Sequence, residues 1–334
     1  LPVLRKRAGG GALMSGPLGD AARGARPGPG AGPGAGATAG AAATGALDDV
    51  RRSAGTARLR GLLRQWGPLL VAFSGGVDST VVLKVALDEL GAGQVLAVTA
   101  SGDVHTDEES AAAREAAARL GARHLVITTN ELRIPGFEAN PPDRCYLCKK
   151  SMYATLLEIA RAEGMKTLVD GGNRDDQTDY RPGSRAAAEL GVRSPLAEAG
   201  MGKAEVRALA REFGLPEWDR PASPCLASRF PYGEPLTAAK FHMVAEGERR
   251  LRAAGLTDCR VRHHGDLARI EVGVDDIPVA AEASVRRAIV RHLREVGYIY
   301  VTLDLEGFRS GSLNEALGRA AAPPAPGAAP EEKA

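Results

Sequence analysis

The chain has 334 residues, of which 44% are hydrophobic and 25% charged, a composition typical of a globular protein that can bury more than one hydrophobic core. Its formal charge is +2, from 43 basic and 41 acidic residues, and this near balance excludes binding to nucleic acid or an anionic membrane through overall charge. No apolar run approaches the roughly 20 residues of a membrane helix, and the N-terminus lacks the layout of a secretory signal. We therefore expect a cytoplasmic protein.

Both ends of the chain have compositions that predict disorder. Residues 1–46 are dominated by Gly, Ala, Pro and Arg, and residues 319–334 are rich in Pro and Ala. Neither segment carries enough apolar area to offset the entropy lost on ordering. Met14 lies inside the first segment, and we expect part of that segment to be a misread start.

Between the tails, short β-rich runs alternate with helical patterns, which is typical of a parallel sheet wrapped by helices. Residues 47–232 are predicted to form this α/β domain. In chain order the expected elements are strand 69–74, helix 77–90, strand 95–100, helix 107–120, strand 124–129, an irregular stretch to 148, helix 149–163, strand 167–172 and helix 203–213.

The pattern changes after a Pro-rich loop over residues 215–235. Residues 233–318 are predicted to form a smaller α+β module. Its expected elements are helix 238–254, a β run over 260–272, helix 279–296 and strand 298–303.

The first predicted strand leads into the first predicted helix through S-G-G-V-D-S, residues 74–79. Such a turn directs backbone N–H groups and the positive end of the helix dipole at one point, which makes an anion site. The spacing fits neither the P-loop nor the G-x-G-x-x-G fingerprint, and the loop has no lysine. In a plainer interpretation Gly75 and Gly76 only make a tight turn; six matching residues between a strand and a helix favour the anion site.

This hexapeptide resembles the PP-loop of the ATP pyrophosphatase superfamily, whose members cleave ATP between the α and β phosphates. A loop that retains a leaving pyrophosphate can use N–H groups, hydroxyls and Mg²⁺ without a lysine. The resemblance implies that Asp78 lies near the metal ion, and Ala100 and Ser101, at the end of the second strand, are expected to line the adenosine pocket. The residues implied to contact phosphate are Ser74, Gly75, Gly76 and Ser79.

Four further motifs narrow the superfamily. They are DRCYLCKK (143–150), VDGGNRDDQTDYRPG (169–183), RPASPCLASRFPYG (220–233) and YVTLDLEGFRSGSLNEAL (300–317). Together they resemble the LarE-type ATP-dependent sulfur transferases, which build the thiocarboxylates of the nickel-pincer cofactor of lactate racemase. The resemblance covers residues 59–317.

The resemblance implies a specific reaction. A carboxylate of pyridinium-3,5-biscarboxylic acid mononucleotide attacks the α-phosphate of ATP and expels pyrophosphate, and a sulfur nucleophile then displaces AMP and leaves a thiocarboxylate. Turning a carboxylate oxygen into part of a phosphate leaving group makes a poor electrophile reactive toward sulfur. The resemblance also implies a sulfide or sulfur-donor protein as partner and a symmetric homo-oligomer, whose contact we expect in the C-terminal module.

Three cysteines bear on the source of the sulfur. One form of the family sacrifices a single cysteine that precedes S-R-F-P-Y-G, and another form holds a [4Fe-4S] cluster with three cysteines. Cys145, Cys148 and Cys225 match the second form, and C-x-x-C thiolates on a turn that enters a helix can converge on one metal centre. We therefore favour the cluster, whose open iron would carry a hydrosulfide, and rank Cys225 as a sacrificed residue second.

Two other interpretations of the cysteines stay open. A structural zinc would need a fourth ligand, which Cys259, His263 or His264 could supply. A disulfide within the C-x-x-C pair is the other. Cys259 itself is most simply a small core residue, because it begins a predicted strand.

Several polar residues near these motifs are further candidates. Ser228 and Arg229 follow Cys225 closely, so the Arg229 fork could steady the adenylate or a substrate carboxylate. Lys149 is placed to neutralise phosphate, although a lysine that faces solvent fits the position equally well. Arg181 lies in a loop after a strand.

Acidic and basic residues in the same regions complete the candidate site. Asp176 and Asp179 lie near Arg181 as potential Mg²⁺ or hydrogen-bonding groups. Arg260 and Arg262 share one strand face and suit a mononucleotide phosphate, although an exposed strand face would explain them as well. The resemblance suggests a Mg²⁺ or substrate contact for Glu248, and Arg309 could bind phosphate or make a subunit contact.

The main rival function is a PP-loop tRNA thiolase. It would need an RNA-binding surface, and the balanced charge and 4% aromatic content disfavour one. A non-catalytic ATP- or cluster-binding regulator is the rival from another class. The intact S-G-G-V-D-S loop together with Cys225, Ser228 and Arg229 argues against it.

Overall fold

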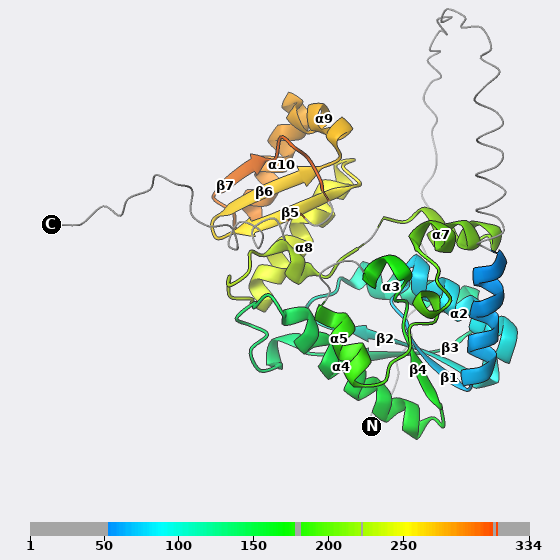
Figure 1. Cartoon of the computed structure of the whole chain (residues 1–334). Helices are drawn as coiled ribbons and strands as arrows, with labels where there is room; N and C mark the ends of the chain where they lie inside the picture. Colours follow the sequence, from blue (N-terminus) through cyan, green and yellow to red (C-terminus); the bar gives the residue numbers. More distant parts are fainter. Residues whose placement is uncertain (1–52, 178–181, 222, 310–311, 313–334) are drawn as a thin grey trace, which may run out of the picture. The chain divides into compact units, whose positions relative to one another are not determined.

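The computed structural model describes residues 53–177, 182–221, 223–309 and 312, and Figure 1 labels their helices and strands. The tails predicted over 1–46 and 319–334 lie outside these residues, as do Asp179 and Arg181. Within the described ranges, no helix combines the length and the apolar character needed to span a bilayer.

The first sheet contains four parallel strands in the order β3-β2-β1-β4. Its central strand β1 reads LLVA, and three of its four residues are fully buried. A continuous apolar run is what a parallel strand needs when helices cover both faces of the sheet. The predicted α/β fold is therefore confirmed. The strands are β1 (Leu69–Ala72), β2 (Val95–Ser101), β3 (Arg123–Thr128) and β4 (Thr167–Val169).

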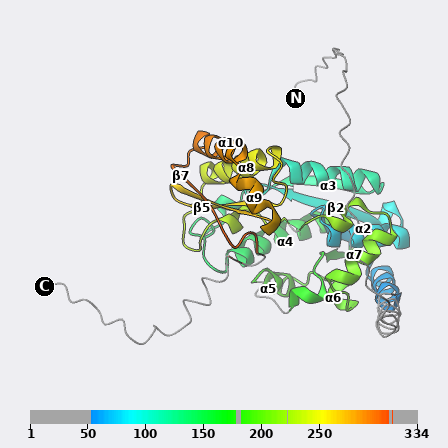
Figure 2. The same cartoon turned by 90° about the horizontal axis from the view of Figure 1, so that it is seen from above.

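Helices cover this sheet on both faces. Leu69 and Val71 point into a core with α2 (Val77–Leu90), α3 (Asp107–Arg119), α7 (Lys203–Glu212) and a helix over residues 53–66. Leu70, between them, points into the opposite core with α4 (Arg144–Ala162) and α5 (Pro182–Glu189). Figure 2 shows α3 and α5 on opposite sides of the strands. The short helix α6 (Pro195–Glu198) precedes α7.

The C-terminal part forms a second, smaller sheet with its own core. Strands β5 and β6 make an antiparallel hairpin around Gly265, whose φ is +60°, and β7 pairs with β6 in parallel. The predicted α+β character of this part is confirmed. Its elements are α8 (Ala238–Ala253), β5 (Cys259–His264), β6 (Leu267–Val272), α9 (Ile277–Ala281), α10 (Ala283–Glu295) and β7 (Tyr300–Leu303).

Two predicted boundaries in the α/β part are wrong by three residues or more, and strand β1 ends at Ala72 and not at residue 74. Helix α4 begins at Arg144 and not at Lys149. The residues that oppose a helix, Pro141 and Pro142, lie before Asp143, and no residue between Asp143 and Lys149 opposes one. The C-x-x-C pair therefore lies in the first two turns of α4 and not on a turn before it. Strand β4 ends at Val169 and not at residue 172, because the next side chain, that of Asp170, accepts a hydrogen bond from the Gly172 N–H and turns the chain.

Two predicted elements of the C-terminal module are each two elements in the structure. The β run over 260–272 is the β5-β6 hairpin, and the helix over 279–296 is α9 followed by α10. The helix is interrupted at Glu282, which has extended backbone (φ −56°, ψ 140°). Helices 53–66, α5 and α6 were not predicted.

Candidate active site

The S-G-G-V-D-S loop joins β1 to α2 and packs its backbone against α3. Gly75 has φ +71°, and a Cβ added there would lie 2.9 Å from the Ala113 Cα, so a side chain at this position would be strained and would clash. The Ser74 and Ser79 Oγ atoms lie 3.2 Å apart, and the Ser79 Oγ also donates to the Gly76 carbonyl over 3.1 Å. The two hydroxyls are thus held together at the start of α2.

Helix α2 presents an uncapped N-terminus to this loop. Gly76 is its N-cap residue and has no side chain to accept a hydrogen bond from the first-turn N–H groups. These donors and the positive end of the helix dipole are therefore available to an anion. The geometry is that of the predicted phosphate site, whose residue roles stay predictions.

The sequence analysis missed a lysine that the fold brings to this loop. Lys203 begins α7, and its Nζ forms an ion pair with Asp78 Oδ2, 125 positions earlier in the chain. Asn173 Nδ2 donates to Asp78 Oδ1 over 3.3 Å. The Arg220 guanidinium donates to the Gly75 carbonyl over 3.5 Å. No local signal could reveal these cations, because each reaches the loop only through tertiary structure.

The end of β2 lies beside the end of β1, because the two strands are parallel neighbours. Ala100 and Ser101 are therefore at the same edge of the sheet as the phosphate loop. Ser101 Oγ lies 2.8 Å from Ser110 Oγ of α3, so this hydroxyl is positioned by a hydrogen bond. Their predicted role, in lining an adenosine pocket, is consistent with this edge and stays a prediction.

Lys149 belongs to a chain of hydrogen bonds that leads into the second core. Its Nζ donates to the Tyr153 hydroxyl over 3.0 Å, and this hydroxyl donates to Asp170 Oδ2 over 2.7 Å. Burial, followed by the Asp170 charge, raises the pKa of Tyr153, so the hydroxyl keeps its proton. A Cβ on Gly183 would lie 2.8 Å from the Lys149 Cδ, so the glycine of the D-Y-R-P-G motif lets α5 approach this lysine.

The three cysteines of the motifs gather in one region. Cys148 and Cys225 pack against the same hydrophobic cluster, which includes Phe137 and Leu226. Burial raises the pKa of Cys148, and the neighbouring Cys225, Glu131 and Cys145 raise it further. The cysteines are therefore close enough to sense one another's charge.

The cysteines are free thiols, so the C-x-x-C pair is not a disulfide. Burial and Cys145 raise the pKa of Cys225, while Arg144 and Arg229 lower it. Within the described ranges, no three His, Cys, Asp or Glu side chains are spaced to hold a metal ion. The three thiols lie close to one another, but their side chains are not in a coordinating arrangement, and the cluster stays a prediction.

Arg229 is held by a buried carboxylate. Its Nε and Nη2 donate to the two oxygens of Glu248 over 2.8 and 3.0 Å, and its Nη1 donates to Ser228 Oγ over 3.0 Å. Burial alone would raise the pKa of Glu248, but Arg229 brings it below the ordinary value. Glu248 therefore acts on Arg229 in this structure, and its predicted Mg²⁺ contact stays a prediction.

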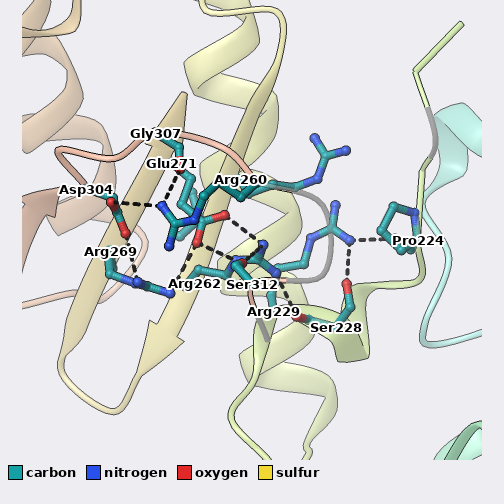
Figure 3. Close-up of polar contacts among 12 residues, drawn as sticks. Pro224, Ser228, Arg229, Arg260, Arg262, Arg269, Glu271, Asp304, Gly307 and Ser312 are labelled. Carbon is teal, nitrogen blue, oxygen red and sulfur yellow. Dashed lines mark hydrogen bonds and ion pairs between the residues drawn. The ribbon is translucent and has the colours of Figure 1, made fainter. Parts of the chain in front are cut away.

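Two further arginines, Arg260 and Arg262, lie close to Arg229, as Figure 3 shows. Arg262 donates to the Ser228 carbonyl over 2.9 Å and to Glu271 Oε2 over 2.7 Å. The Arg260 guanidinium lies 4.8 Å from the centre of the Phe308 ring. Both arginines are buried, so the alternative of an exposed strand face is wrong. Burial, followed by the charge of Arg229, lowers the pKa of Arg260.

The remaining candidates have other surroundings. Cys259 is fully buried in the core of the small sheet, as predicted, and donates to the Glu248 carbonyl. His263 Nδ1 lies 3.1 Å from the Tyr298 hydroxyl. Arg309 forms ion pairs with Asp304 and Glu306. The sequence analysis also missed Glu271, which is fully buried and receives hydrogen bonds from two arginines.

Comparison with known proteins identifies the family. Residues 58–139 match the asparagine synthase family. The chain is 43% identical over 264 residues to pyridinium-3,5-bisthiocarboxylic acid mononucleotide synthase of Lactiplantibacillus plantarum, an alignment that covers 79% of this chain and 95% of that protein. The chain belongs to the LarE family. As a LarE-type protein with a PP-loop domain, it is an ATP-dependent enzyme with sulfur transferase activity.

Two other relatives differ in how much of this chain their alignment covers. An uncharacterized protein of Synechocystis sp. is 45% identical over 264 residues, which cover 78% of this chain and 98% of that protein. Argininosuccinate synthase of Halobacterium salinarum is 34% identical over 162 residues, only 45% of this chain and 40% of that protein. The likeness to LarE relatives thus extends over most of the chain, while that to argininosuccinate synthase covers less than half.

Proposed function

We propose that this enzyme adenylates the carboxylates of pyridinium-3,5-biscarboxylic acid mononucleotide and converts them to thiocarboxylates for a nickel-pincer cofactor. One observation carries the proposal: the segment that bears Cys225 is tied to the phosphate loop. Arg220, five positions before Cys225, contacts the Gly75 carbonyl, and Ser223 Oγ donates to Glu109 of α3. A sulfur-bearing residue in a segment anchored at an ATP loop fits adenylation followed by sulfur transfer.

The ATP end of the proposed site is built from the phosphate loop. The N–H groups of Gly75, Gly76 and the first turn of α2 hold the β and γ phosphates, with the Ser74 and Ser79 hydroxyls as additional donors. Asp78, held by Asn173 and Lys203, is placed to bind Mg²⁺ or to release Lys203 to a phosphate oxygen. The sequence analysis left the loop without a lysine, and Lys203 fills that role in this proposal.

The chemistry follows in two steps. A carboxylate oxygen of the substrate attacks the α-phosphorus of ATP. The bond between the α-phosphorus and the oxygen that bridges to the β-phosphorus breaks, and pyrophosphate leaves. A hydrosulfide-level sulfur then attacks the acyl carbon, the bond to the phosphate oxygen breaks, and AMP leaves with one oxygen of the original carboxylate. Arg229, fixed by Glu248, is placed to stabilise the negative charge on the acyl oxygen during the second step. Lys149, near Cys148 on α4, is proposed to neutralise phosphate.

The substrate's own phosphate is proposed to bind at the arginines of the small sheet. Arg260 and Arg262 are buried, and Arg229 lies near enough to lower the pKa of Arg260. An anion would relieve that repulsion. Because Arg262 also contacts the Ser228 carbonyl, a phosphate bound there would lie within one nucleotide's length of Cys225.

The sulfur is proposed to come through a [4Fe-4S] cluster held by Cys145, Cys148 and Cys225. When bound, such a cluster supplies a renewable sulfur nucleophile. The burial that raises the pKa values of Cys148 and Cys225 disfavours bare thiolates, and metal ligation would compensate for that cost. If the cluster is absent, the same chemistry with Cys225 as sacrificed donor predicts a single turnover.

The C-terminal module is proposed to carry the oligomer contact, with the domain boundary at residue 232. The described residues include six large hydrophobic side chains that are exposed, and five of them lie in this module. Such a concentration of exposed apolar side chains is typical of an interaction surface. The five are Val274, Val279, Ile299, Tyr300 and Leu305.

Nucleotide product analysis tests the proposed function. With ATP, Mg²⁺ and the dicarboxylate, the anaerobically purified enzyme should release AMP and pyrophosphate in equal amounts, and release should depend on the dicarboxylate. Cys225→Ala should retain pyrophosphate release and lose thiocarboxylate formation. Release of ADP, or turnover that depends on tRNA instead of the dicarboxylate, would overturn the proposal.

A further inference from the structure

Arg144 is a buried cation, and two of its three guanidinium nitrogens have no hydrogen-bond partner among the described residues. It is 3% exposed, and its Nε and Nη1 are buried without any hydrogen-bond partner. No carboxylate among the described residues forms an ion pair with it. Its guanidinium lies 4.6 Å from the centre of the Tyr232 ring and makes a cation–π contact with it.

The contact with Tyr232 does not offset the cost of burying the charge of Arg144. Burial of an ion without a counter-ion costs more free energy than a cation–π contact returns. The described part of the chain therefore carries an uncompensated charge, and an anion from outside the chain would compensate it.

The position of Arg144 says where that anion would bind. Arg144 is the first residue of α4, and the N-cap residue Asp143 gives this helix no side-chain cap. The helix dipole therefore adds positive potential at the same point. The segment just before Arg144 is tied to the segment after Arg229, because Asn140 Nδ2 donates to the Pro231 carbonyl over 2.7 Å and the Gly233 N–H donates to the Asn140 carbonyl over 2.9 Å.

Arg144 also lies beside the region that contains Cys225. Arg144 lies one helical turn before Cys148, and Cys148 packs against the same hydrophobic cluster as Cys225. The Arg229 Nη1 donates to the Cys225 carbonyl over 3.2 Å. Arg229 is already paired with Glu248 on both carboxylate oxygens. Of these two cations near Cys225, Arg144 is therefore the one whose charge no described carboxylate balances.

We propose that Arg144 binds the substrate carboxylate that is not being adenylated. This inference rests on the proposed function, in which the substrate carries two carboxylates on one aromatic ring. The reacting carboxylate must lie beside the sulfur at Cys225, so the second one lies on the same ring, a short distance away. A guanidinium matches a carboxylate in charge and shape, and the Tyr232 ring holds it in one plane. The ATP phosphates and the nucleotide phosphate have their own proposed sites, so the second carboxylate is the anion left to place.

Calorimetric binding of two nucleotides to the enzyme tests this. The ligands are the pyridinium-3,5-dicarboxylate mononucleotide and the same nucleotide with only the 3-carboxylate. For Arg144→Met the dicarboxylate should bind about 10- to 100-fold more weakly, the loss of one charged hydrogen-bonded contact, while the affinity for the monocarboxylate stays within about threefold. Arg144→Lys should recover part of the dicarboxylate affinity. The exposed Arg133→Met is the matched control and should change neither affinity.

A second readout separates binding from a structural role. Removal of an uncompensated buried charge should leave the free Arg144→Met protein at least as stable as wild type in urea, whereas loss of a structural residue would destabilise it. Equal losses for both nucleotides, no loss for either, or a destabilised Arg144→Met would overturn the inference. If the wild type binds neither nucleotide, the proposed function fails instead.

Discussion

The buried pair between Arg229 and Glu248 gives the sharpest prediction of stability. Both side chains are 3% exposed, and the carboxylate accepts hydrogen bonds from two guanidinium nitrogens over 2.8 and 3.0 Å and from the Val261 N–H over 3.1 Å. Glu248→Ala removes all three bonds and leaves the guanidinium buried without its partner. Such a broken pair costs about 3–5 kcal/mol in the free energy of unfolding.

Glu246→Ala is the matched control on the same helix. The Glu246 carboxylate binds Arg249 and Arg250, each over 2.7 Å, but these guanidinium groups remain open to solvent. Exposed pairs contribute about 0–1 kcal/mol. In equilibrium urea denaturation followed by far-UV circular dichroism, Glu248→Ala should therefore lose several times more stability than Glu246→Ala.

Two outcomes would refute this reasoning. One is that Glu248→Ala costs no more than Glu246→Ala, which would mean that water or another side chain satisfies Arg229. The other concerns the double variant Arg229→Met/Glu248→Leu, in which both charges are replaced by apolar groups. It should be less destabilised than Glu248→Ala alone, and a sum of two large losses would contradict the account.

Three further predictions follow from the same geometry. Gly75→Ala should lower the free energy of unfolding by about 1–2 kcal/mol and remove most ATP-dependent activity, because φ is +71° and the new Cβ meets α3. Gly76 has φ −79°, so the control Gly76→Ala should fold normally in the same assays. Lys203→Met should weaken the binding of magnesium pyrophosphate, measured by calorimetry, about 10-fold. The control Lys84→Met breaks an exposed ion pair on α2 and should not weaken it. Equal affinities for the two variants would exclude Lys203 from the site. In the folded state the pKa of Glu248 is below its ordinary value of 4.5. The difference in stability between wild type and Glu248→Gln should therefore be complete above pH 4.5 and shrink as the pH falls through the folded pKa. A difference that does not change with pH would contradict this.

The phosphate loop could be predicted from sequence because its signal is local. The strand, the two glycines and the helix follow one another within a dozen residues, and α2 has the predicted bounds 77–90. The start of α4 was misplaced because the C-x-x-C residues suggested a loop, while the local propensity after Asp143 allows a helix. The Asp170 side chain ended β4 early, an effect that hydrophobic periodicity does not report.

The residues that the sequence did not reveal are those defined by partners far along the chain. Lys203 reaches Asp78 over 125 positions, and Glu271 meets Arg262 only because β5 and β6 form a hairpin. Arg144 stands out because the described residues give its Nε and Nη1 no hydrogen-bond partner, which a sequence cannot show. Whether each of these side chains is buried, and which partner it contacts, depends on the packing of the whole chain.

The central claim, that a substrate carboxylate becomes a mixed anhydride with AMP, is tested most directly by following an oxygen atom. The dicarboxylate is prepared with ¹⁸O in its carboxyl groups and incubated with ATP, Mg²⁺ and the enzyme, and the AMP is analysed by mass spectrometry. The account predicts one ¹⁸O in the phosphate of each AMP released with a thiocarboxylate. AMP that carries only ordinary oxygen while thiocarboxylate accumulates would contradict it.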